Sequence, residues 1–401
     1  MKAVKDKVVV ALTGNDAVAE AMRQVNPDVV AAYPITPQTE LMHKFADYVA
    51  DGDVKTEFVL VESEHSAMSA AVGASAAGSR VMTATSANGL ALMWEIVYIA
   101  ASTRLPIVMA VVNRALSAPI NIHCDHSDTM GGRDTGWIQL YGENHQEAYD
   151  NCIQAVRIGE HMDVRLPVMH MYDGYVISGA IGPLQMLTKE QVQEFIGPYR
   201  AVNPMLDARH PVTVGPFDGL HGWYFEHKVA QNRAMERSFK VIQDVADDFA
   251  TVSGRRYGLL DPYRLEDAEI AIVVVGSTAG TTRMTVDKLR AKGVKAGMAR
   301  VRVFRPFPYD EYAEALQHVK VVGVLDRADS FGAQGGPVFM EVRSALYDCD
   351  PRPQVLPFIY GLGGRDIFPD NIEQAFAELE KAAGSTKRVS TERRYLNLRK
   401  D

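Results

Sequence analysis

The sequence predicts an α/β fold with parallel sheets, and two observations support that prediction. Short runs of Val, Ile, Leu and Ala alternate with helical stretches from residue 7 to about residue 180, and the alternation returns from residue 263. Strands that are apolar on both faces and separated by helices are typical of parallel sheets covered by helices on both sides. The chain of 401 residues, of which 47% are hydrophobic, is long enough for two or three domains with separate cores.

The first alternating region predicts six strands and five helices. Val and Ile favour the strands, and glycine closes some of the helices, as Gly52 does. The strands are expected within residues 7–13, 28–34, 56–63, 80–86, 105–114 and 166–174. The helices are expected within residues 17–25, 39–52, 64–79, 89–104 and 146–162. We place all six strands in one parallel sheet.

The composition changes after about residue 190, which divides the chain into four parts. Residues 1–190 form the first domain, and residues 191–262 form a connector with one amphipathic helix within 225–254. Residues 263–385 form a second α/β domain, and residues 386–401 form a basic tail that we expect to be frayed and solvated. The second domain has its strands within 268–277, 295–308, 320–328 and 354–364, and its helices within 279–293, 309–319 and 335–348.

Charge and motifs exclude several classes of protein. A formal net charge of -8 argues against binding to nucleic acid or an anionic membrane. The N-terminal apolar run is too short for a secretion signal, and no run approaches the roughly 18 apolar residues of a membrane span, so we expect a cytoplasmic protein. The three cysteines are far apart, which argues against disulfides or a four-cysteine metal or iron–sulfur site within this chain. Walker A and Gly-x-Gly-x-x-Gly loops are missing from the sequence, so nucleotide binding has no physical basis here.

The first candidate site segment is Tyr-Pro-Ile-Thr-Pro, at the end of an expected strand. Pro34 has no N–H for a sheet ladder, so the strand must end there. Pro34 and Pro37 restrict the backbone on both sides of Thr36, which would aim its hydroxyl at a ligand bound at the carboxyl ends of the strands. In the alternative interpretation, Thr36 caps the next helix and Pro37 takes its first position. The two roles are compatible.

Glu62 and Glu64 lie at the end of the next expected strand. A helix begins between them, so Glu64 would lie at a helix start, where a carboxylate can act on a ligand or simply favour the helix dipole. The helix that follows has a face of Ala and Gly, which lets another backbone approach closely and is consistent with a subunit contact.

Arg114 ends another expected strand, and its guanidinium has the fork geometry that suits a carboxylate ligand. A polar cluster follows in the next loop and consists of His123, Cys124, Asp125, His126 and Asp128. Its spacing fits no standard zinc pattern. We therefore interpret the cluster as a polar loop at the mouth of a site and assign no metal to it.

Several long segments carry a family resemblance. In the first half they are AAYPITPQTEL, VESEHSAMSAAVGASAAGSRVMTATSANGLALMWE, LPIVMAVVNRALSAPINIHCDHSDTMGGRDTGWIQL and LPVMHMYDGY, and in the second half VRVFRPFP, VVGVLDRADSFGAQGG and GLGGRD. Together, and in this order, they resemble the alpha subunit of the 2-oxoacid:ferredoxin (acceptor) oxidoreductases, the pyruvate synthase family. The resemblance extends over nearly the whole chain.

The resemblance implies a thiamine-diphosphate-binding fold, with a pyrimidine-binding first domain and a transketolase C-terminal-like second domain. A beta subunit would hold the diphosphate and Mg²⁺, because this chain has no Gly-Asp-Gly motif of thiamine enzymes. The [4Fe-4S] clusters would lie in partner subunits, which include a gamma and a ferredoxin-like delta subunit, and coenzyme A would be the co-substrate. The assembly would be a dimer of the heteromer. Its acceptor would be ferredoxin, or NAD where a flavin subunit is present.

The resemblance also implies roles for individual residues. Glu64 matches the glutamate that faces N1′ of the aminopyrimidine, and Arg114 matches the arginine that holds the substrate carboxylate. Thr36 matches the threonine of the family motif and would help to orient the 2-oxo acid. Pro34 and Asn88 complete the expected cofactor-binding set.

The resemblance gives pyruvate as the first expected substrate. Gly131 and Gly132 follow the carboxylate-binding segment and could widen the pocket for a branched or aromatic 2-oxo acid such as phenylglyoxylate, or could simply form a turn. A third hypothesis is a scaffold subunit whose thiamine site has decayed, although Thr36, Glu64 and Arg114 are all present.

Overall fold

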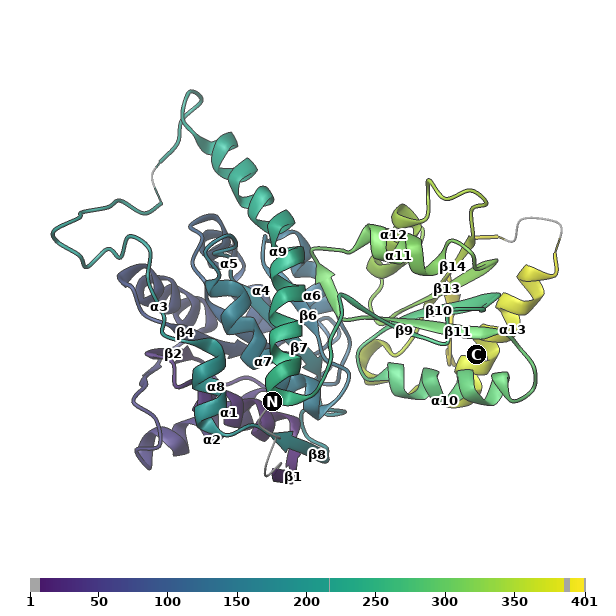
Figure 1. Ribbon diagram of the computed structural model, residues 1–401, viewed down its shortest axis with the longest axis horizontal. Coiled ribbons are helices and arrows are strands. Elements are labelled where there is room, and N and C mark those ends of the chain that lie inside the picture. The colour runs from purple at the N-terminus through teal and green to yellow at the C-terminus, as the bar shows by residue number, and fades with distance from the viewer. Residues whose placement is uncertain (1–7, 216, 386–389, 400–401) are drawn as a thin grey trace.

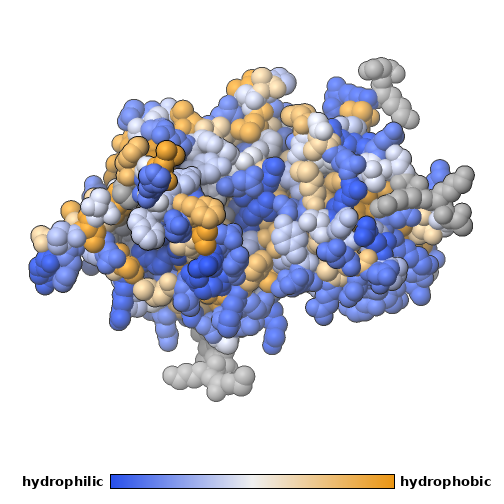
Figure 2. Space-filling model, turned by 90° about the horizontal axis from the view of Figure 1, so that it is seen from above, coloured by the Kyte–Doolittle hydropathy of each residue, from blue (hydrophilic) through white to orange (hydrophobic). Residues whose placement is uncertain are grey.

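The computed structural model describes residues 8–215, 217–385 and 390–399, and these form two α/β lobes side by side (Figure 1). The first half of the chain forms the lobe on the left of the figure, and the second half forms the lobe on the right. Among these described residues, none of the helices is both long and apolar enough to cross a membrane. Seen from above (Figure 2), apolar areas are scattered among hydrophilic ones, and more of them lie over the first lobe.

A seven-stranded sheet organises the first lobe, with its strands in the order β12-β6-β7-β5-β4-β2-β3. Its strands are β2 (Val29–Ala32), β3 (Glu57–Leu60), β4 (Val81–Thr85), β5 (Val108–Asn113), β6 (Ile138–Tyr141), β7 (Val168–Asp173) and β12 (Val303–Arg305). Neighbouring strands are parallel, except that β12 is antiparallel to β6. Strands β3, β2, β4 and β5 are therefore consecutive neighbours, and their carboxyl ends meet at one edge of the sheet, where open α/β sheets bind ligands.

Helices cover both faces of this sheet. They are α1 (Gly14–Val25), α2 (Thr39–Ala50), α3 (Glu64–Ala77), α4 (Ala87–Leu92), α5 (Trp94–Ser102), α6 (Ser127–Gly131), the short 3₁₀ helix η1 (Gly132–Asp134) and α7 (His145–Glu160). Helices α1, α2 and α7 share one hydrophobic core with one face of the strands, and α3, α4 and α5 share a second core with the other face. Helix α1 begins where it does because the Thr13 hydroxyl accepts a hydrogen bond from the Asp16 N–H at 3.1 Å.

The second lobe contains a six-stranded sheet in the order β15-β14-β13-β10-β11-β9. Its strands are β9 (Leu260–Tyr263), β10 (Ile270–Val275), β11 (Ala296–Val301), β13 (Val321–Asp326), β14 (Gln354–Ile359) and β15 (Arg394–Tyr395). Its helices are α10 (Thr278–Arg290), α11 (Tyr309–Leu316), α12 (Pro337–Ala345), the 3₁₀ helix η2 (Leu362–Gly364) and α13 (Pro369–Ala383). All its strand pairs are parallel except β9 with β11, so the predicted second α/β unit is confirmed.

The segment between the two sheets contains α8 (Lys189–Ile196) and the long helix α9 (Tyr224–Ser253). The expected amphipathic helix is therefore confirmed, whereas α8 was not predicted. Buried side chains of α9, such as Ile242 and Phe249, belong to the core of the first lobe. Burial of each such side chain contributes about 1.5–3 kcal/mol to folding, which holds α9 against α7. The first turns of α9 extend along the edge of the first lobe (Figure 1), where Lys228 Nζ donates to Ser102 Oγ of α5 at 2.6 Å.

The first expected strand does not join the parallel sheet. It forms β1 (Val8–Thr13), which pairs antiparallel with β8 (Ile181–Met186) in a separate two-stranded sheet. Its apolar run suggested a strand buried on both faces, but Val8 and Val9 are 51% and 66% exposed. The prediction of the strand is confirmed, and its assignment to the parallel sheet is wrong.

The expected strand within residues 295–308 divides between the two lobes. Strand β11 lies in the second sheet, whereas β12 completes the first sheet beside β6. The break falls at Arg302, whose buried guanidinium donates to Asn151 Oδ1 and Gln154 Oε1 of α7, both at 3.1 Å. These bonds hold the chain against the first lobe as it leaves β11.

Two further differences concern short elements. Strand β6 was not predicted, because it has only four residues and carries the buried polar side chain of Gln139. The helix expected within residues 89–104 is divided at Met93 into α4 and α5.

The C-terminal tail is partly ordered against the second sheet, in contrast to the expected frayed tail. Residues 394–395 form β15, which pairs with β14, and Arg394 Nε donates to Glu378 at 2.5 Å. Of the tail expected at 386–401, residues 386–389 and 400–401 lie outside the described residues.

Candidate active site

The turn after β2 is held by Gln38 rather than by Thr36. Helix α2 begins at Thr39 with Gln38 in the cap position, so the expected capping role of Thr36, with Pro37 as the first helical residue, is wrong. The buried side chain of Gln38 accepts a hydrogen bond from the Ile35 N–H at 3.1 Å and donates to the carbonyl of Ala84 at 3.3 Å. Gln38 thereby fixes the turn to the end of β4.

Thr36 and Arg114 meet at the mouth of the site. Arg114 follows β5 and is 6% exposed, and its Nη1 donates to the backbone carbonyl of Thr36 at 2.9 Å. Its Nε donates to the Asn121 carbonyl at 3.4 Å, and Nη2 donates to none of the described residues. The side chain of Thr36 is exposed, and so is that of Pro34 in the same turn. The Nη2 group of Arg114 is therefore free of protein acceptors within the described residues, and the exposed side chain of Thr36 is in the turn that Arg114 contacts.

Glu64 is the first residue of α3, as the sequence indicates. Ser63 caps this helix by accepting a hydrogen bond from the Ser66 N–H at 3.2 Å. The carboxylate of Glu64 is buried, and it accepts no hydrogen bond from the part of the chain that the structure describes. It lies against Gly89 of α4, because a Cβ at that position would come within 2.8 Å of Glu64 Oε1 and 2.4 Å of Thr85 Oγ1. Only glycine leaves room for the carboxylate there.

Asn88 connects the segments that follow β4 and β5. It is exposed at the start of α4, where its Nδ2 lies 3.2 Å from Ser117 Oγ and its Oδ1 accepts from the Ser117 N–H at 3.4 Å. Asn88 therefore lies beside the loop that begins at Arg114, and its side chain forms no hydrogen bond with Glu64, Thr36 or Pro34.

Asp128 is the buried centre of this edge of the sheet. Its carboxylate accepts hydrogen bonds from the backbone N–H groups of Ala87, Arg114 and Thr129 and from the side chain of Asn113. Burial raises the pKa of Asp128 to about 6, against the hydrogen bonds that favour its ionised form. Sequence analysis assigned Asp128 only to a polar loop.

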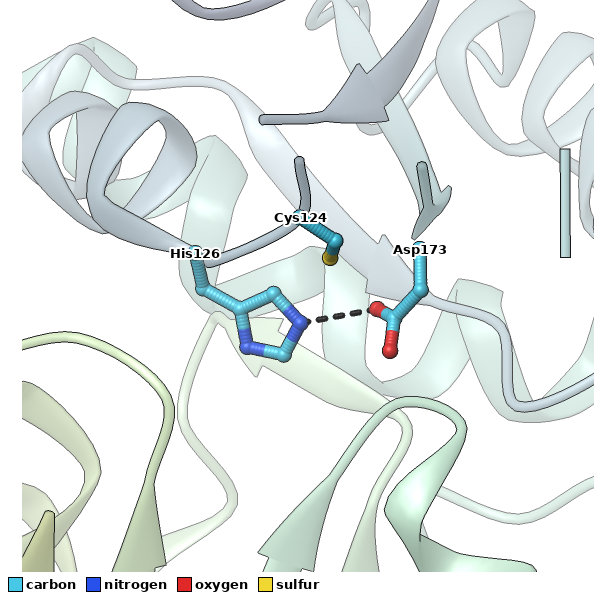
Figure 3. A group of neighbouring side chains, drawn as sticks. All are labelled: Cys124, His126 and Asp173. Carbon is cyan, nitrogen blue, oxygen red and sulfur yellow. Dashed lines mark hydrogen bonds and ion pairs between the residues drawn. The ribbon is translucent and has the colours of Figure 1, made fainter. Parts of the chain in front are cut away.

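Cys124, His126 and Asp173 lie together beneath the site (Figure 3), with one potential ligand atom of each within 4.8 Å of the others. His126 Nε2 is 2.8 Å from Asp173 Oδ1, and Arg327 Nη1 of the second lobe donates to Asp173 Oδ2 at 2.8 Å. Ser277 of the second lobe also donates to Oδ2, through its N–H at 3.1 Å and its hydroxyl at 2.5 Å.

This arrangement is a buried ion-pair network between the two lobes. Burial by itself would raise the pKa of Asp173, but His126 and Arg327 hold it well below its usual range. Burial also raises the pKa of the Cys124 thiol. Because Arg327 of the second lobe pairs with the Asp173 carboxylate, the group joins the second lobe to the loop that follows Arg114.

Two family models match the chain. Residues 20–247 match the model described as pyruvate flavodoxin/ferredoxin oxidoreductase, thiamine diphosphate-binding, and residues 268–372 match pyruvate:ferredoxin oxidoreductase core domain II. The chain belongs to the 2-oxoacid:ferredoxin oxidoreductase family, as an alpha subunit. The predicted resemblance is confirmed, and the alpha subunit is part of an oxidoreductase that acts on 2-oxo acids.

Relatives of this alpha subunit match it along nearly its whole length. Pyruvate synthase subunit PorA of Thermotoga maritima is 56% identical over 390 residues, which cover 97% of this chain and 98% of the relative. Ketoisovalerate oxidoreductase subunit VorA of Pyrococcus horikoshii is 42% identical over 378 residues, which cover 94% of this chain and 95% of that subunit.

A solved structure supports the fold. It is 2-oxoglutarate:ferredoxin oxidoreductase from Magnetococcus marinus with 2-oxoglutarate, coenzyme A and succinyl-CoA bound, and it superposes with a TM-score of 0.72 at 22% identity. The match covers 93% of this chain and 65% of the other, so this alpha subunit spans about two thirds of that longer chain. The alpha subunit has the predicted thiamine-diphosphate-binding fold with a transketolase C-terminal-like second domain.

The residues around Glu64 fit the pyrimidine half of thiamine diphosphate. Besides the Glu64 carboxylate, which has no described donor, the hydroxyls of Thr85 and Ser86 are buried without a hydrogen-bond partner among the described residues. Buried polar groups are normally paired, so the Glu64 carboxylate and the Thr85 hydroxyl, which both lie against Gly89, suit the polar groups of an aminopyrimidine.

Gly131 and Gly132 lie at the junction of α6 and η1. Gly131 has right-handed helical backbone angles, Gly132 has a φ of -79° and a ψ of 2°, and neither residue has a positive φ. A Cβ at Gly131 would meet no atom within 4 Å, and one at Gly132 would meet its first neighbour at 3.9 Å. Neither a left-handed turn nor close packing therefore requires glycine at these positions in the alpha subunit.

Sequence reasoning missed three residues that shape this site. Gln38 fixes the Thr36 turn, Gly89 makes room for Glu64, and Asp173 anchors the loop network. Each follows or lies near the carboxyl end of an expected strand, which is the signal that could have drawn attention to them.

Proposed function

We propose that this alpha subunit provides the pyrimidine side of a thiamine-diphosphate site and binds a 2-oxo acid, with pyruvate as the first substrate. The reaction is the coenzyme A-dependent oxidative decarboxylation of the 2-oxo acid to acyl-CoA and CO₂. The observation that carries the proposal is the arrangement of Glu64, Thr36 and Arg114 after β3, β2 and β5, at one edge of the sheet. Identity of 56% to a pyruvate synthase subunit supports pyruvate.

Glu64 acts on the cofactor. When bound, thiamine diphosphate supplies a nucleophilic carbon for the 2-oxo group and an electron sink for decarboxylation. The Glu64 carboxyl group holds a proton at N1′ of the aminopyrimidine and so favours the tautomer that acts as a base. Glu64 is only 6% exposed, so few water molecules can compete for this proton.

Arg114 binds the carboxylate of the 2-oxo acid. Its Nη1 and Nε donate to the Thr36 and Asn121 carbonyls, which leaves the Nη2 donors for the substrate. A charge-assisted contact of this kind fixes orientation as well as charge. The exposed Thr36 hydroxyl lies beside it and helps to orient the keto group, while Pro34 and Asn88 line the cofactor side.

Partner subunits complete the site in this proposal. Leu60, Leu92 and Ile120 are 72%, 53% and 76% exposed. Leu60 ends the strand before Glu64, Leu92 is in the same helix as Asn88, and Ile120 lies in the loop after Arg114. Exposed apolar side chains around a site suit a partner surface. We propose that a beta subunit covers them and supplies the diphosphate site with Mg²⁺, with gamma and ferredoxin-like delta subunits and [4Fe-4S] clusters in a dimer of the heteromer.

The remaining parts of the proposal concern the acceptor, the compartment and the domains. Ferredoxin is the proposed acceptor, with NAD as the alternative where a flavin subunit is present, and the complex is cytoplasmic. We propose domain boundaries at residues 190, 262 and 385. The acceptor and the compartment rest on the family, and the boundaries rest on the change of composition along the chain.

The role of Glu64 is tested by Glu64→Gln in a complex reconstituted with its partner subunits. The amide cannot hold the proton in the same way, so turnover should fall at least roughly 100-fold, within the usual range for general acid–base groups, while the complex still assembles. Glu62→Gln is the matched control, because Glu62 is exposed two residues away and bonded to Ser66. Full activity of Glu64→Gln in an assembled complex would refute the assignment.

Substrate choice is tested by turnover of pyruvate, 2-oxoglutarate, ketoisovalerate and phenylglyoxylate. We expect the highest kcat/KM with pyruvate, and the VorA relative makes ketoisovalerate the second candidate. The relatives described above give no support to an aromatic acid. Turnover of phenylglyoxylate alone would overturn the pyruvate proposal, and a complex that assembles without any turnover would favour a scaffold with a decayed thiamine site.

A further inference from the structure

One buried carboxylate touches two of the segments that carry the candidate active site. Asp128 of α6 is 2% exposed, and its Oδ2 accepts hydrogen bonds from the N–H of Arg114 at 3.0 Å and from the N–H of Ala87 at 3.2 Å. Ala87 is the first residue of α4, and Gly89 in the same helix lies against the Glu64 carboxylate. A single oxygen atom thus connects the arginine of the site with the helix beside its glutamate.

The second oxygen of Asp128 is also fully engaged by the protein. Oδ1 accepts from Asn113 Nδ2 at 2.8 Å, from the Thr129 N–H at 2.7 Å and from the Thr129 hydroxyl at 3.3 Å. The Thr129 hydroxyl in turn lies 2.7 Å from the hydroxyl of Tyr141. Because the carboxylate is buried and both oxygens are bonded to the protein, Asp128 can affect a substrate only through the groups that it holds.

The loop between Arg114 and Asp128 is also bonded to the second lobe. Asn121 Nδ2 donates to the carbonyl of Gly363 at 2.9 Å, and the Gly363 N–H donates to Asp125 Oδ2 at 3.0 Å. The second lobe therefore holds the middle of the loop. A change at Asp128 cannot be absorbed by a free loop, so it must move the backbone of Arg114 or of α4.

We propose that Asp128 is a positioning residue for the 2-oxo acid reaction: its carboxylate sets the spacing between Arg114 and the start of α4, and so between the carboxylate-binding guanidinium and Glu64. This inference rests on the proposed function, in which Arg114 binds the substrate carboxylate. Two N–H groups bonded to one oxygen cannot separate without the loss of one charge-assisted hydrogen bond. Misplacement of a substrate-binding group by a fraction of an ångström to 1 Å is costly in an enzyme.

The test is a double-mutant cycle of Asp128→Asn and Arg114→Ala in the reconstituted complex. Asn keeps the shape of Asp, but it has only one acceptor oxygen. Its NH₂ group replaces the other oxygen and faces N–H donors that then lack an acceptor. We expect Asp128→Asn to raise the KM for pyruvate about tenfold and to lower kcat less than about threefold. Arg114→Ala should raise KM further. The double variant should lie within about twofold of Arg114→Ala, because Asp128 acts through Arg114.

Thr129→Val is the matched control. Thr129 belongs to the same buried group, but it contacts Asp128 only at Oδ1, which does not bond to Arg114 or Ala87. Loss of the Thr129 hydroxyl should therefore lower the stability of the protein and leave the KM for pyruvate within about twofold. Asp128→Glu is the second variant, because it keeps the charge and both acceptors but displaces them by one methylene. It should assemble even if Asp128→Asn does not, and it should raise KM by a similar factor.

Three results would contradict the inference or its basis in different ways. A wild-type KM in an assembled Asp128→Asn or Asp128→Glu complex would overturn the positioning role. A double variant with fully additive losses would also overturn it, because Asp128 would then act independently of Arg114. A wild-type KM in Arg114→Ala would instead refute the substrate-binding role of Arg114, and with it the proposed function on which the inference rests.

Discussion

Buried polar side chains hold the backbone of the candidate site, while the groups that would meet a ligand are left free. Gln38 and Asp128 are bonded to main-chain groups on several segments, whereas the Glu64 carboxylate has no donor within the described residues. A buried donor that loses its acceptor costs about 1–3 kcal/mol. The supporting residues are therefore more sensitive to substitution than their distance from the ligand suggests.

His170 in the centre of β7 makes the stability of the chain depend on pH. It is fully buried, and neither ring nitrogen has a hydrogen-bond partner among the described residues. Burial lowers the pKa of His170 from 6.5 to about 3. The unfolded chain therefore binds a proton more readily than the folded chain, so the contribution of neutral His170 is fully present above pH 6.5 and is lost as the pH falls.

The resulting prediction concerns His170→Leu. Between pH 8 and pH 5.5, protonation of this residue in the unfolded chain should lower the free energy of unfolding by roughly 1.4 kcal/mol. His170→Leu should lack this loss, and His43→Gln, at an exposed position of α2, should retain it. Urea unfolding at the two pH values measures the difference. An equal loss in His170→Leu and in the unsubstituted chain would show that His170 is not the responsible group.

At the scale of elements, an aspartate at the end of strand β13 caps helix α12, which follows β13 after a loop. Asp326 ends β13, and its carboxylate accepts hydrogen bonds from the N–H groups of Val338 at 2.8 Å and Phe339 at 3.0 Å, in the first turn of α12. The two elements fit closely, because a Cβ at Gly336 would lie 2.2 Å from Asp326 Cγ. Burial raises the pKa of Asp326 to about 7.

Asp326→Ala should therefore destabilise the second lobe. Two N–H groups at the start of α12 would lose their acceptor, at a cost of about 1–3 kcal/mol in the free energy of unfolding. Asp348→Ala is the control, because Asp348 is exposed just after the same helix and should change stability by less than about 0.5 kcal/mol. Thermal unfolding followed by circular dichroism measures both. Equal midpoints would contradict the capping role.

Elements that are long and apolar were predictable, and short elements with polar side chains were not. The fully buried runs of β5, β7 and β10 gave clear signals, whereas β6 has a buried glutamine and β12 has only three residues. In the candidate site, Glu64 and Arg114 could be proposed because Arg114 directly follows β5 and Glu64 begins the helix after β3. The Asp173–Arg327 pair could not, since its residues are 154 positions apart and meet only when the two lobes come together.

At the scale of the whole molecule, the two lobes share a core and a buried network of charges. One hydrophobic cluster includes Met109 of the first sheet together with Val273 and Phe339 of the second lobe. Nearby, Arg300 of β11 donates to Glu147 of α7 at 2.7 and 2.8 Å, with both side chains buried. The lobes are therefore expected to unfold together.

Arg300→Met tests this coupling. It leaves Glu147 buried without its partner, so the free energy of unfolding should fall by about 3–5 kcal/mol. A second substitution, Glu147→Leu, should restore much of that loss, because a buried unpaired charge costs more than an apolar pair. Lys240→Met removes an exposed ion pair with Asp244 and should cost less than about 0.5 kcal/mol. A small loss in Arg300→Met, equal to the loss in Lys240→Met, would contradict the coupling.

Strand β12 affects the order in which the molecule can be assembled during synthesis. It completes the first sheet beside β6, although the chain must be made as far as residue 305 before it exists. At roughly 5–20 residues per second, on the order of ten to thirty seconds separate the emergence of β6 from that of β12. Throughout this interval the newly made sheet has an open edge at β6, where a strand of another chain could pair with it.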